Sequence, residues 1–370
     1  MALTMGARPA LFSAATQQRP DFAFGSLGGG YTLMAFMPGE LESHVAAMAE
    51  LERQGASFGL ADRAAFSIVQ DRQRFEDART LLPWLRHFHD PDSQIADVFL
   101  LNDDEKRAGC FILLDPSLRV VVACDLDRSE ALYRLIANLA PAELHGGVPI
   151  HAPVLILPRI FEPDFCRRLI DVYNQDGGAR SGVMRQIDGM TVGVIDGFKS
   201  RKDAHVTDPE LKKQIRLRIT HRLLPEIEKA FSFKATRMER YIVARYNAEE
   251  GGYFKRHRDN TTKGTAHRQF ACSINLNAEE FEGGNLRFPE FGPRTYRPPT
   301  GGAVIFSCSL LHEATPVTKG TRFAFLPFFH DEANEKIRME NHKFVSGTID
   351  GRTVGAGGIA LPPEQSGLQF

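Results

Sequence analysis

Cysteine is scarce in this chain, and its distribution excludes a disulfide framework. The five cysteines among 370 residues are odd in number, widely scattered and include no C-x-x-C pair. This pattern predicts reduced thiols in a cytoplasmic protein. Long apolar runs are also missing, because the longest, such as residues 154–157 and 323–329, are strand-sized and predict no membrane span. A secretory signal is not predicted either, since no basic segment followed by a long apolar run stands at the N-terminus.

A surplus of either charge sign is absent as well. The formal net charge of −1 gives no global attraction to nucleic acid or to an anionic membrane, and we expect neither as a partner. The hydrophobic content of 43% and the charged content of 25% are typical of an ordinary globular protein. A chain of 370 residues exceeds one ordinary core. Two domains are therefore predicted, residues 1–148 and 149–370, with the boundary in a Pro- and Gly-containing segment.

The first predicted domain alternates strand and helix signals, which favours a compact α/β fold. Apolar and β-branched runs predict strands, and apolar residues at helical spacing predict helices. The strands are expected at residues 31–37, 109–114 and 118–124, and the helices at 40–53, 75–87 and 128–139. The segment His87-Phe88-His89-Asp90 is interpreted as a helix end and a loop rather than a ligand cluster.

The second predicted domain begins with helices and continues with strands. Glu162-Pro163 and Asp208-Pro209 are typical helix starts, and Pro225 predicts a kink or restart. From residue 236 the signals turn to β, and the tail after residue 346 is expected to be irregular. The strands are expected at residues 238–246, 270–276, 285–288, 303–307 and 322–329. This order predicts an α+β domain in which helices buttress a β-sandwich or barrel, with its core at 236–332.

Four residues of that core form the chemical motif of the chain. His257 and Asp259 stand at i and i+2, so they share a face in an extended strand. His312 and then Arg322 follow downstream. Two histidines and a carboxylate are the ligand set of non-haem iron(II) oxygenases, and a planar guanidinium matches a carboxylate. Alternatives remain open: His267 as a ligand, His312 as a core residue and Arg322 as a surface strand residue.

Residues 240–332 resemble the prolyl 4-hydroxylase-like iron(II)/2-oxoglutarate dioxygenases. The resemblance rests on the sequence at 246–253, 257–260, 275–277, 282–289, 309–317 and 320–324. It implies a double-stranded β-helix, or jelly roll, in which His257, Asp259 and His312 bind Fe(II). It further implies 2-oxoglutarate and O2 as cosubstrates, with ascorbate as an additional reductant.

The same resemblance suggests how the cosubstrate is held. Arg322 would bind the distal carboxylate of 2-oxoglutarate. Tyr246 stands where the family places a cosubstrate-binding tyrosine, although packing explains it equally well, and Tyr253 is a second tyrosine near the metal. Another tyrosine of the family is replaced by Asn275. Thr321 or Ser273 is expected to compensate.

The first half resembles redoxin domains, which are peroxiredoxin-like and have the thioredoxin fold. The resemblance rests on the sequence at 19–22, 31–51, 89–92 and 110–116. Such peroxidases need a reactive cysteine where the helix after the first long strand begins. Residues 38–53 contain no cysteine, and the first one in the chain is Cys110. A non-catalytic scaffold, dimerisation surface or docking module is therefore expected.

Together these features predict a 2-oxoglutarate-dependent dioxygenase that hydroxylates an aliphatic C–H bond and releases succinate and CO2. By resemblance the substrate is a prolyl residue of a peptide or protein, and a small molecule remains open. Segments 182–202 and 291–297 are expected to set substrate choice. A redox or oxygen sensor or adaptor is the alternative function, and the redoxin-like half makes a homodimer a reasonable expectation.

Overall fold

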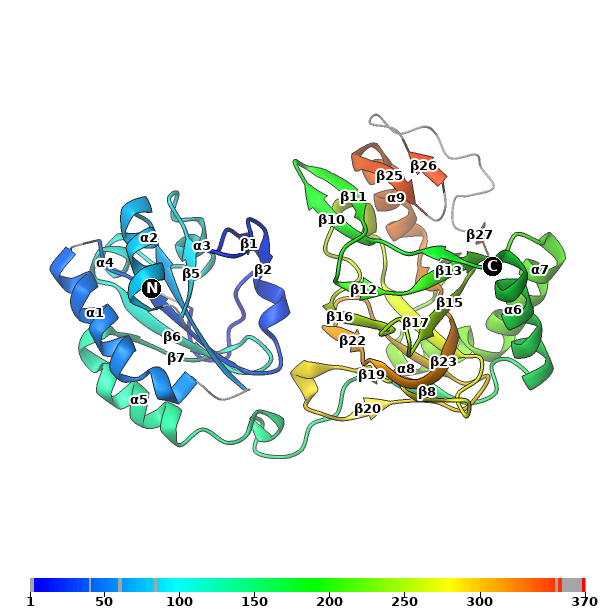
Figure 1. Cartoon of the computed structure of the whole chain (residues 1–370), viewed down its shortest axis with the longest axis horizontal. Helices are drawn as coiled ribbons and strands as arrows, with labels where there is room; N and C mark the ends of the chain where they lie inside the picture. The colour runs from blue at the N-terminus through cyan, green and yellow to red at the C-terminus, as the bar shows by residue number, and fades with distance from the viewer. Residues whose placement is uncertain are drawn as a thin grey trace. The chain divides into compact units, whose positions relative to one another are not determined.

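The chain forms two compact units. A computed structural model describes residues 3–39, 41–58, 62–82, 85–349, 352–354 and 368–369. One unit comprises Met1–Ala152 with Phe288–Arg294, and the other comprises Pro153–Arg287 with Thr295–Phe370 (Figure 1). Within the described ranges, no helix is long and apolar enough to cross a membrane.

A five-stranded mixed sheet forms the centre of the N-terminal unit. Its strand order is β5-β4-β3-β6-β7. The three strands on one side are parallel, and β6 and β7 run antiparallel to their neighbours. Every residue of β3 and β6 is buried, because these strands are covered on both faces. The strands are β3 (Tyr31–Phe36), β4 (Arg63–Val69), β5 (Arg86–His89), β6 (Cys110–Leu114) and β7 (Val120–Asp125), with a small separate pair β1 (Ser13–Ala14) and β2 (Phe22–Ala23).

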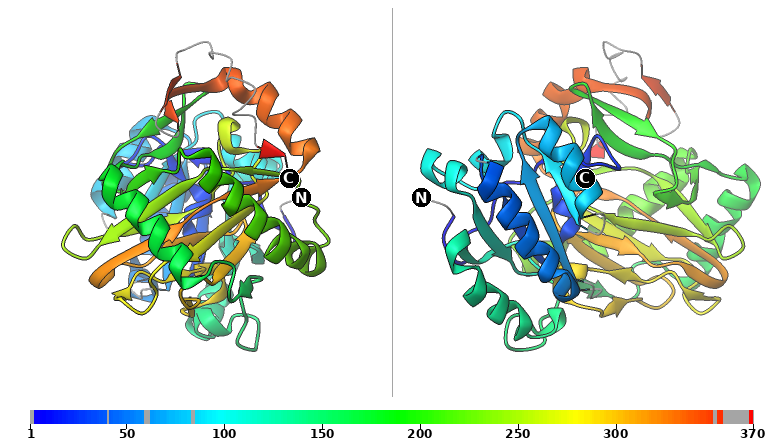
Figure 2. Two further views of the ribbon diagram at one scale, coloured as in Figure 1. Left: turned by 90° about the vertical axis from the view of Figure 1, so that its right-hand side faces the viewer. Right: turned by 60° about the vertical axis from the view of Figure 1, so that its left-hand side comes forward.

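Helices cover both faces of this sheet, so the unit is α/β as predicted. Residues of α1, α2 and α5 pack with Leu33 and Leu113 on one face, and α3 packs with Phe66 and Ile112 on the other. Helix α1, in blue, crosses the sheet in the right-hand view of Figure 2. The helices are α1 (Leu41–Arg53), α2 (Arg72–Leu81), α3 (Gln94–Val98), α4 (Asp103–Ala108) and α5 (Ser129–Ala137).

The predicted helix at 75–87 is wrong at its end. Helix α2 stops at Leu81, and Arg86–His89 is strand β5. His87 is fully buried there and forms a hydrogen bond with the hydroxyl of Ser67. Pro83, which would kink a helix over 75–87, lies outside the described residues. The apolar residues at helical spacing in 75–87 belong to a helix followed by a strand, and their common spacing is coincidental.

Two main sheets form the C-terminal unit. The larger follows the order β27-β14-β24-β17-β23-β15-β13-β9, with β18, β21 and β8 attached, and the smaller has the order β12-β16-β22-β19-β20. The larger contains β8 (Leu155–Leu157), β9 (Ala179–Arg180), β13 (Lys202–His205), β14 (Arg237–Glu239), β15 (Ile242–Asn247), β17 (Phe270–Asn275), β18 (Phe281–Gly283), β21 (Ala303–Ser307), β23 (Val317–Phe325), β24 (Phe328–His330) and β27 (Leu368–Gln369). The smaller contains β12 (Lys199–Ser200), β16 (Tyr253–His257), β19 (Leu286–Arg287), β20 (Thr295–Tyr296) and β22 (His312–Ala314).

Helices buttress one face of the larger sheet, as the sequence predicts. Buried residues such as Leu169, Ile215 and Ile227 pack against Ile274 and Phe325 of the strands. Helices α6 and α7, in green, lie over this face in the left-hand view of Figure 2. The opposite face of the sheet is therefore available for a site. The helices are α6 (Pro163–Asp176), α7 (Pro209–Arg222), α8 (Leu224–Phe231) and α9 (Glu332–Asn341).

Some strands differ from their predicted extent. The run expected at 238–246 is divided at Arg240, whose φ of +68° interrupts the extended backbone between β14 and β15. The run expected at 322–329 is divided before Phe328, since Pro327 cannot donate a ladder hydrogen bond. A further sheet contains β10 (Val183–Ile187), β11 (Met190–Val194), β25 (Val345–Ile349) and β26 (Arg352–Val354). The tail is thus not irregular throughout.

Candidate metal and cosubstrate site

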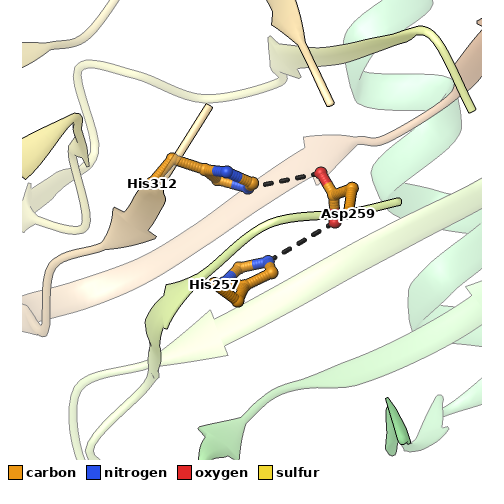
Figure 3. Close-up of side chains that lie close together, drawn as sticks. All are labelled: His257, Asp259 and His312. Carbon is orange, nitrogen blue, oxygen red and sulfur yellow. Dashed lines mark ion pairs between the residues drawn. The ribbon is translucent and has the colours of Figure 1, made fainter. Parts of the chain in front are cut away.

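Strands of the smaller sheet bring the three predicted ligands together. Strands β16 and β22 are antiparallel, and His257 pairs directly with His312. Asp259 lies just beyond the end of β16, where its backbone N–H donates to the carbonyl of Cys308 at 2.9 Å. This bond keeps the chain after β16 close to the strand that leads to His312. Residues far apart in sequence therefore meet across one strand pair (Figure 3).

The carboxylate of Asp259 lies between the two imidazoles. Its Oδ1 is 3.5 Å from Nε2 of His257, and its Oδ2 is 3.3 Å from Nε2 of His312 (Figure 3). The potential ligand atoms of the three residues all lie within 4.8 Å of one another. Among the residues that the structure describes, this is the one cluster of three or more His, Cys, Asp or Glu side chains with such spacing.

The backbone fixes which ring nitrogen of each histidine faces the cluster. Nδ1 of His257 is 2.7 Å from the carbonyl of Lys255, and Nδ1 of His312 is 3.0 Å from the carbonyl of Leu310. A carbonyl only accepts, so each Nδ1 carries the proton and donates it. Each Nε2 is then left as an acceptor with its lone pair toward the cluster, which is the tautomer that a metal ligand requires.

Electrostatics favour a neutral His312 beside an ionised carboxylate. Burial and the neighbouring His257 together lower the pKa of His312 to about 4. Burial alone would raise the pKa of Asp259, yet the imidazoles of His312 and His257 hold this pKa below its usual range. Two neutral imidazoles and one carboxylate form a donor set for a divalent cation of the first transition series.

Aromatic rings restrict the histidines from the sides. The ring of Phe254 stacks on that of His257, with centroids 3.5 Å apart, and the ring of Phe306 lies 4.6 Å from that of His312. An irregularity in β16 between Phe254 and His257 allows both side chains to face the same side. The ligands are thus held in place by packing as well as by hydrogen bonds.

A pocket of about 490 Å³, open solvent included, contains this cluster. Residues of both main sheets line it, so the pocket lies between the sheets. Its lining is mainly apolar, with convergent charged groups, as in many small-molecule sites. The polar and charged residues are Arg201, Arg240, Tyr246, His257, Asp259, Ser273, His312 and Arg322.

Arg322 supplies a buried cation to this pocket from the larger sheet. Only 3% of the residue is exposed. Nη2 donates to the hydroxyl of Ser273 at 2.7 Å, and Nε donates to Oδ1 of Asn275 at 3.3 Å. These neutral acceptors orient the guanidinium without neutralising its charge. A bound anion is the group that would neutralise it.

The other predicted cosubstrate residues divide into two groups. Tyr246 lines the pocket, and Asn275 orients Arg322 and donates to the carbonyl of Pro298 at 2.8 Å. Thr321 instead accepts from Asn247 at 2.9 Å, because neighbouring residues of a strand point to opposite faces. The hydroxyl of Tyr253 donates to the carbonyl of Gly197 at 2.8 Å. Neither Thr321 nor Tyr253 lines the pocket, and Ser273 takes the compensating place near Arg322.

Sequence reasoning did not single out Arg201, Asp203 or Arg240, although Arg201 falls within segment 182–202, which we expect to set substrate choice. Arg201 and Arg240 line the pocket, and Asp203 forms an ion pair with Arg201 at 2.7 Å. The alternation Arg201-Lys202-Asp203 was the available signal, because i and i+2 residues share a strand face. Strand β13 lacks the β-rich composition that would have revealed it.

Comparisons with known proteins agree with this site. Residues 241–330 match the model of the 2OG-Fe(II) oxygenase superfamily. A PKHD-type hydroxylase of Cupriavidus metallidurans is 33% identical over 95 residues, which are 23% of this chain and 42% of that protein. The chain spans about half the length of the curated relatives it matches. The similarity of the C-terminal unit to 2-oxoglutarate-dependent dioxygenases, expected from the sequence, is thus confirmed.

Solved structures resemble each half at low sequence identity. A prolyl hydroxylase of Trichoplax adhaerens, in complex with a hypoxia inducible factor peptide fragment, is 17% identical, with a TM-score of 0.40 over 58% of this chain and 94% of that one. A putative protein disulfide isomerase of Bacteroides thetaiotaomicron is 18% identical, with a TM-score of 0.33 over 39% of this chain and 94% of that one. These matches concern folds.

Proposed function

We propose that this protein is an Fe(II)- and 2-oxoglutarate-dependent dioxygenase that hydroxylates an aliphatic C–H bond. One observation carries the proposal: Asp259 lies between two Nε2 atoms whose rings are fixed by backbone carbonyls, in the same pocket as the cation of Arg322. The match of residues 241–330 to the oxygenase superfamily supports it. We also propose that the two main sheets form a double-stranded β-helix around this pocket.

The donor set fits iron(II), and the pocket fits its cosubstrate. His257, Asp259 and His312 would hold the metal, which when bound supplies the redox chemistry with O2. Arg322 would bind the distal carboxylate of 2-oxoglutarate, with Ser273 and Asn275 orienting its guanidinium. The hydroxyl of Tyr246, which lines the pocket, would contact the same cosubstrate. Phe254, Phe306 and Phe328 exclude water from the lining.

The overall reaction accounts for every atom and electron. 2-Oxoglutarate loses CO2 and takes one oxygen atom of O2 to become succinate, and the other oxygen atom enters the C–H bond of the substrate. The cosubstrate and the substrate each contribute two electrons to O2. We propose a prolyl residue of a peptide or protein as the substrate, because the prolyl 4-hydroxylase-like motifs span the whole site. Ascorbate remains a prediction as an auxiliary reductant.

The test follows succinate formation from 2-oxoglutarate, with and without added iron(II) and ascorbate and with and without proline-containing peptides. The wild type is expected to form succinate only when iron is present. Proline-containing peptides that are substrates should increase the amount of succinate. His257→Ala should abolish it, since a ligand is lost. His221→Ala changes an exposed histidine of helix α7 and should leave it intact. Full turnover by the His257→Ala protein would contradict the proposal.

A further inference from the structure

Arg201 connects the pocket to a buried hydrogen-bond network. The residue directly precedes β13, lines the pocket and is 7% exposed. Its Nη2 donates to Oδ2 of Asp203 at 2.7 Å and to Oγ of Ser181 at 3.1 Å. Because the guanidinium is planar and rigid, two contacts at one nitrogen fix the direction in which Nη1 points.

The two acceptors of Arg201 have further partners of their own. Oγ of Ser181 donates to Oδ2 of Asp203 at 2.5 Å and accepts from Nζ of the buried Lys199 at 2.8 Å. Asp203 in addition lies 3.6 Å from Nη2 of Arg240. Ser181 and Asp203 are therefore held in place by the protein itself, and they fix Arg201 before any ligand binds.

The remaining nitrogen, Nη1 of Arg201, is directed at Tyr246. It donates to the hydroxyl of this tyrosine at 3.4 Å. Strand β15, which carries Tyr246, lies between β13 and β23 in the larger sheet. The guanidinium carbon of Arg201 is 5.8 Å from the centre of the tyrosine ring, and that of Arg322 is 5.1 Å from it. The ring is thus located between the two arginines along the sheet.

This contact decides what the phenolic proton of Tyr246 can do. A phenolic hydroxyl carries one proton, which it can donate while its oxygen accepts. Among the described residues, Arg201 is the one hydrogen-bond partner of this hydroxyl. A guanidinium has no acceptor atom, so the proton of Tyr246 is not shared with Arg201. The proton is therefore available to an acceptor in the pocket, which Tyr246 lines.

Arg322 would bring such an acceptor to the same place. Tyr246 and Arg322 are direct partners in the register of β15 and β23. In the proposed function, a carboxylate of 2-oxoglutarate binds Arg322 and so lies beside the phenol ring. A hydrogen bond to an ionised group is shorter and stronger than one between neutral groups. The direction of the phenolic proton then affects how tightly the cosubstrate is held.

We propose that Arg201 is a positioning residue that presents the phenolic proton of Tyr246 to a carboxylate of 2-oxoglutarate. Asp203 and Ser181 hold Arg201 in the orientation that this requires. The inference rests on the proposed function and adds to it a residue that does not itself touch the cosubstrate. Since Arg201 acts through Tyr246, the effect of its substitution on cosubstrate binding depends on the tyrosine hydroxyl.

A double-mutant cycle tests this dependence by calorimetric titration of 2-oxoglutarate into full-length protein loaded with Mn(II). Tyr246→Phe removes the hydroxyl and should raise the Kd of 2-oxoglutarate about 10-fold. Arg201→Lys retains the positive charge but lacks the planar fork, and should raise the Kd about 5-fold. In the Tyr246→Phe background, Arg201→Lys should change the Kd by less than about 2-fold. A residue that contacted the cosubstrate directly, or only supported the fold, would lower the affinity by the same factor in both backgrounds.

A milder substitution and a matched control complete the cycle. Ser181→Ala removes one acceptor of Arg201 and should raise the Kd about 3-fold, again only where the hydroxyl of Tyr246 is present. Arg245→Lys is the control, since Arg245 lies on β15 but pairs with Glu250 at 3.2 Å and does not line the pocket. It should leave the Kd unchanged in both backgrounds.

Equal losses of affinity from Arg201→Lys in the two backgrounds would overturn the inference, as would an unchanged Kd in Tyr246→Phe. If the Arg201→Lys protein does not fold, Ser181→Ala decides in the same way. Iron-dependent succinate formation by the wild type tests the dioxygenase proposal separately. If the wild type forms succinate and binds 2-oxoglutarate while the losses of affinity add, the inference alone fails. If the wild type does neither, the proposed function fails and the inference with it.

Discussion

The two units bury polar groups in opposite ways. In the C-terminal unit, the charged residues His257, Asp259, Arg201, Arg240 and Arg322 line one pocket. In the N-terminal unit, the buried His87 contacts Ser67, and the buried Asp90 accepts from the backbone N–H groups of Ile95 and Ala96. The first arrangement gathers charged side chains in one pocket, whereas the second satisfies His87 and Asp90 inside the fold.

The largest effect expected within this comparison is at Arg322. Arg322→Gln removes the cation that would bind the distal carboxylate, so the KM for 2-oxoglutarate should rise by about 100-fold. The maximal rate should change less, because the metal ligands are untouched. Steady-state succinate formation measures both. Arg245→Gln on the neighbouring strand is the control, and an unchanged KM in Arg322→Gln would place the cosubstrate elsewhere.

Buried carboxylates should contribute to stability with opposite pH dependence in the two units. Burial would raise the pKa of Glu239, but Arg268, His267 and Arg338 hold it well below its usual value. Its contribution is present above the unfolded pKa of about 4.3 and is lost as pH falls through the folded value. Burial raises the pKa of Asp90. Its contribution is present below about pH 3.9 and is lost as pH rises through the folded value.

Matched amide variants measure this difference. Glu239→Gln removes the buried carboxylate that faces Arg268 and His267 and should lower the free energy of unfolding at pH 7 by about 3 kcal/mol. Asp90→Asn retains one of the two oxygens that accept from the backbone N–H groups of Ile95 and Ala96, and the loss of the other should lower the free energy of unfolding by about 1 kcal/mol. Hydrogen exchange of peptides from each unit measures the change in the free energy of unfolding for both variants. The exchange rates are corrected for the intrinsic rates between pH 3 and 7. Equal decreases in the free energy of unfolding for the two variants would contradict the expected difference between the units.

The smallest effect is expected for the thiols of the N-terminal unit. Burial raises the pKa of Cys110 to about 12 and also raises that of Cys124. Little reactive thiolate is then present at neutral pH. Cys110→Ala and Cys124→Ala should leave peroxide consumption and iodoacetamide labelling at background. Peroxide consumption that disappears in either variant would revive a thiol peroxidase or a redox sensor.

The sequence predicted best where spacing alone determines geometry. The i and i+2 spacing of His257 and Asp259 predicted that they share a site, although Asp259 lies in a turn just beyond β16. The helices beginning at Pro163 and Pro209 follow from their start signals. The sequence did not predict the positions of residues that tertiary contacts bring into the pocket. Strand β13 has a polar composition, so no apolar pattern revealed this strand or Arg201 just before it. Thr321 and Tyr253 do not line the pocket, because sequence proximity to a site residue does not determine the face of the strand.

The backbone carbonyls that orient His257 and His312 have an evolutionary consequence. In many metal sites a side chain sets the ring orientation, and mutation of that side chain weakens metal binding. Here Lys255 and Leu310 act through their main chains, so substitution of their side chains preserves the acceptors. Residues such as Arg201 and Arg240 can therefore vary without altering the tautomers of the metal ligands. Mutations that change the pocket lining thus leave the metal ligands and their orientation intact.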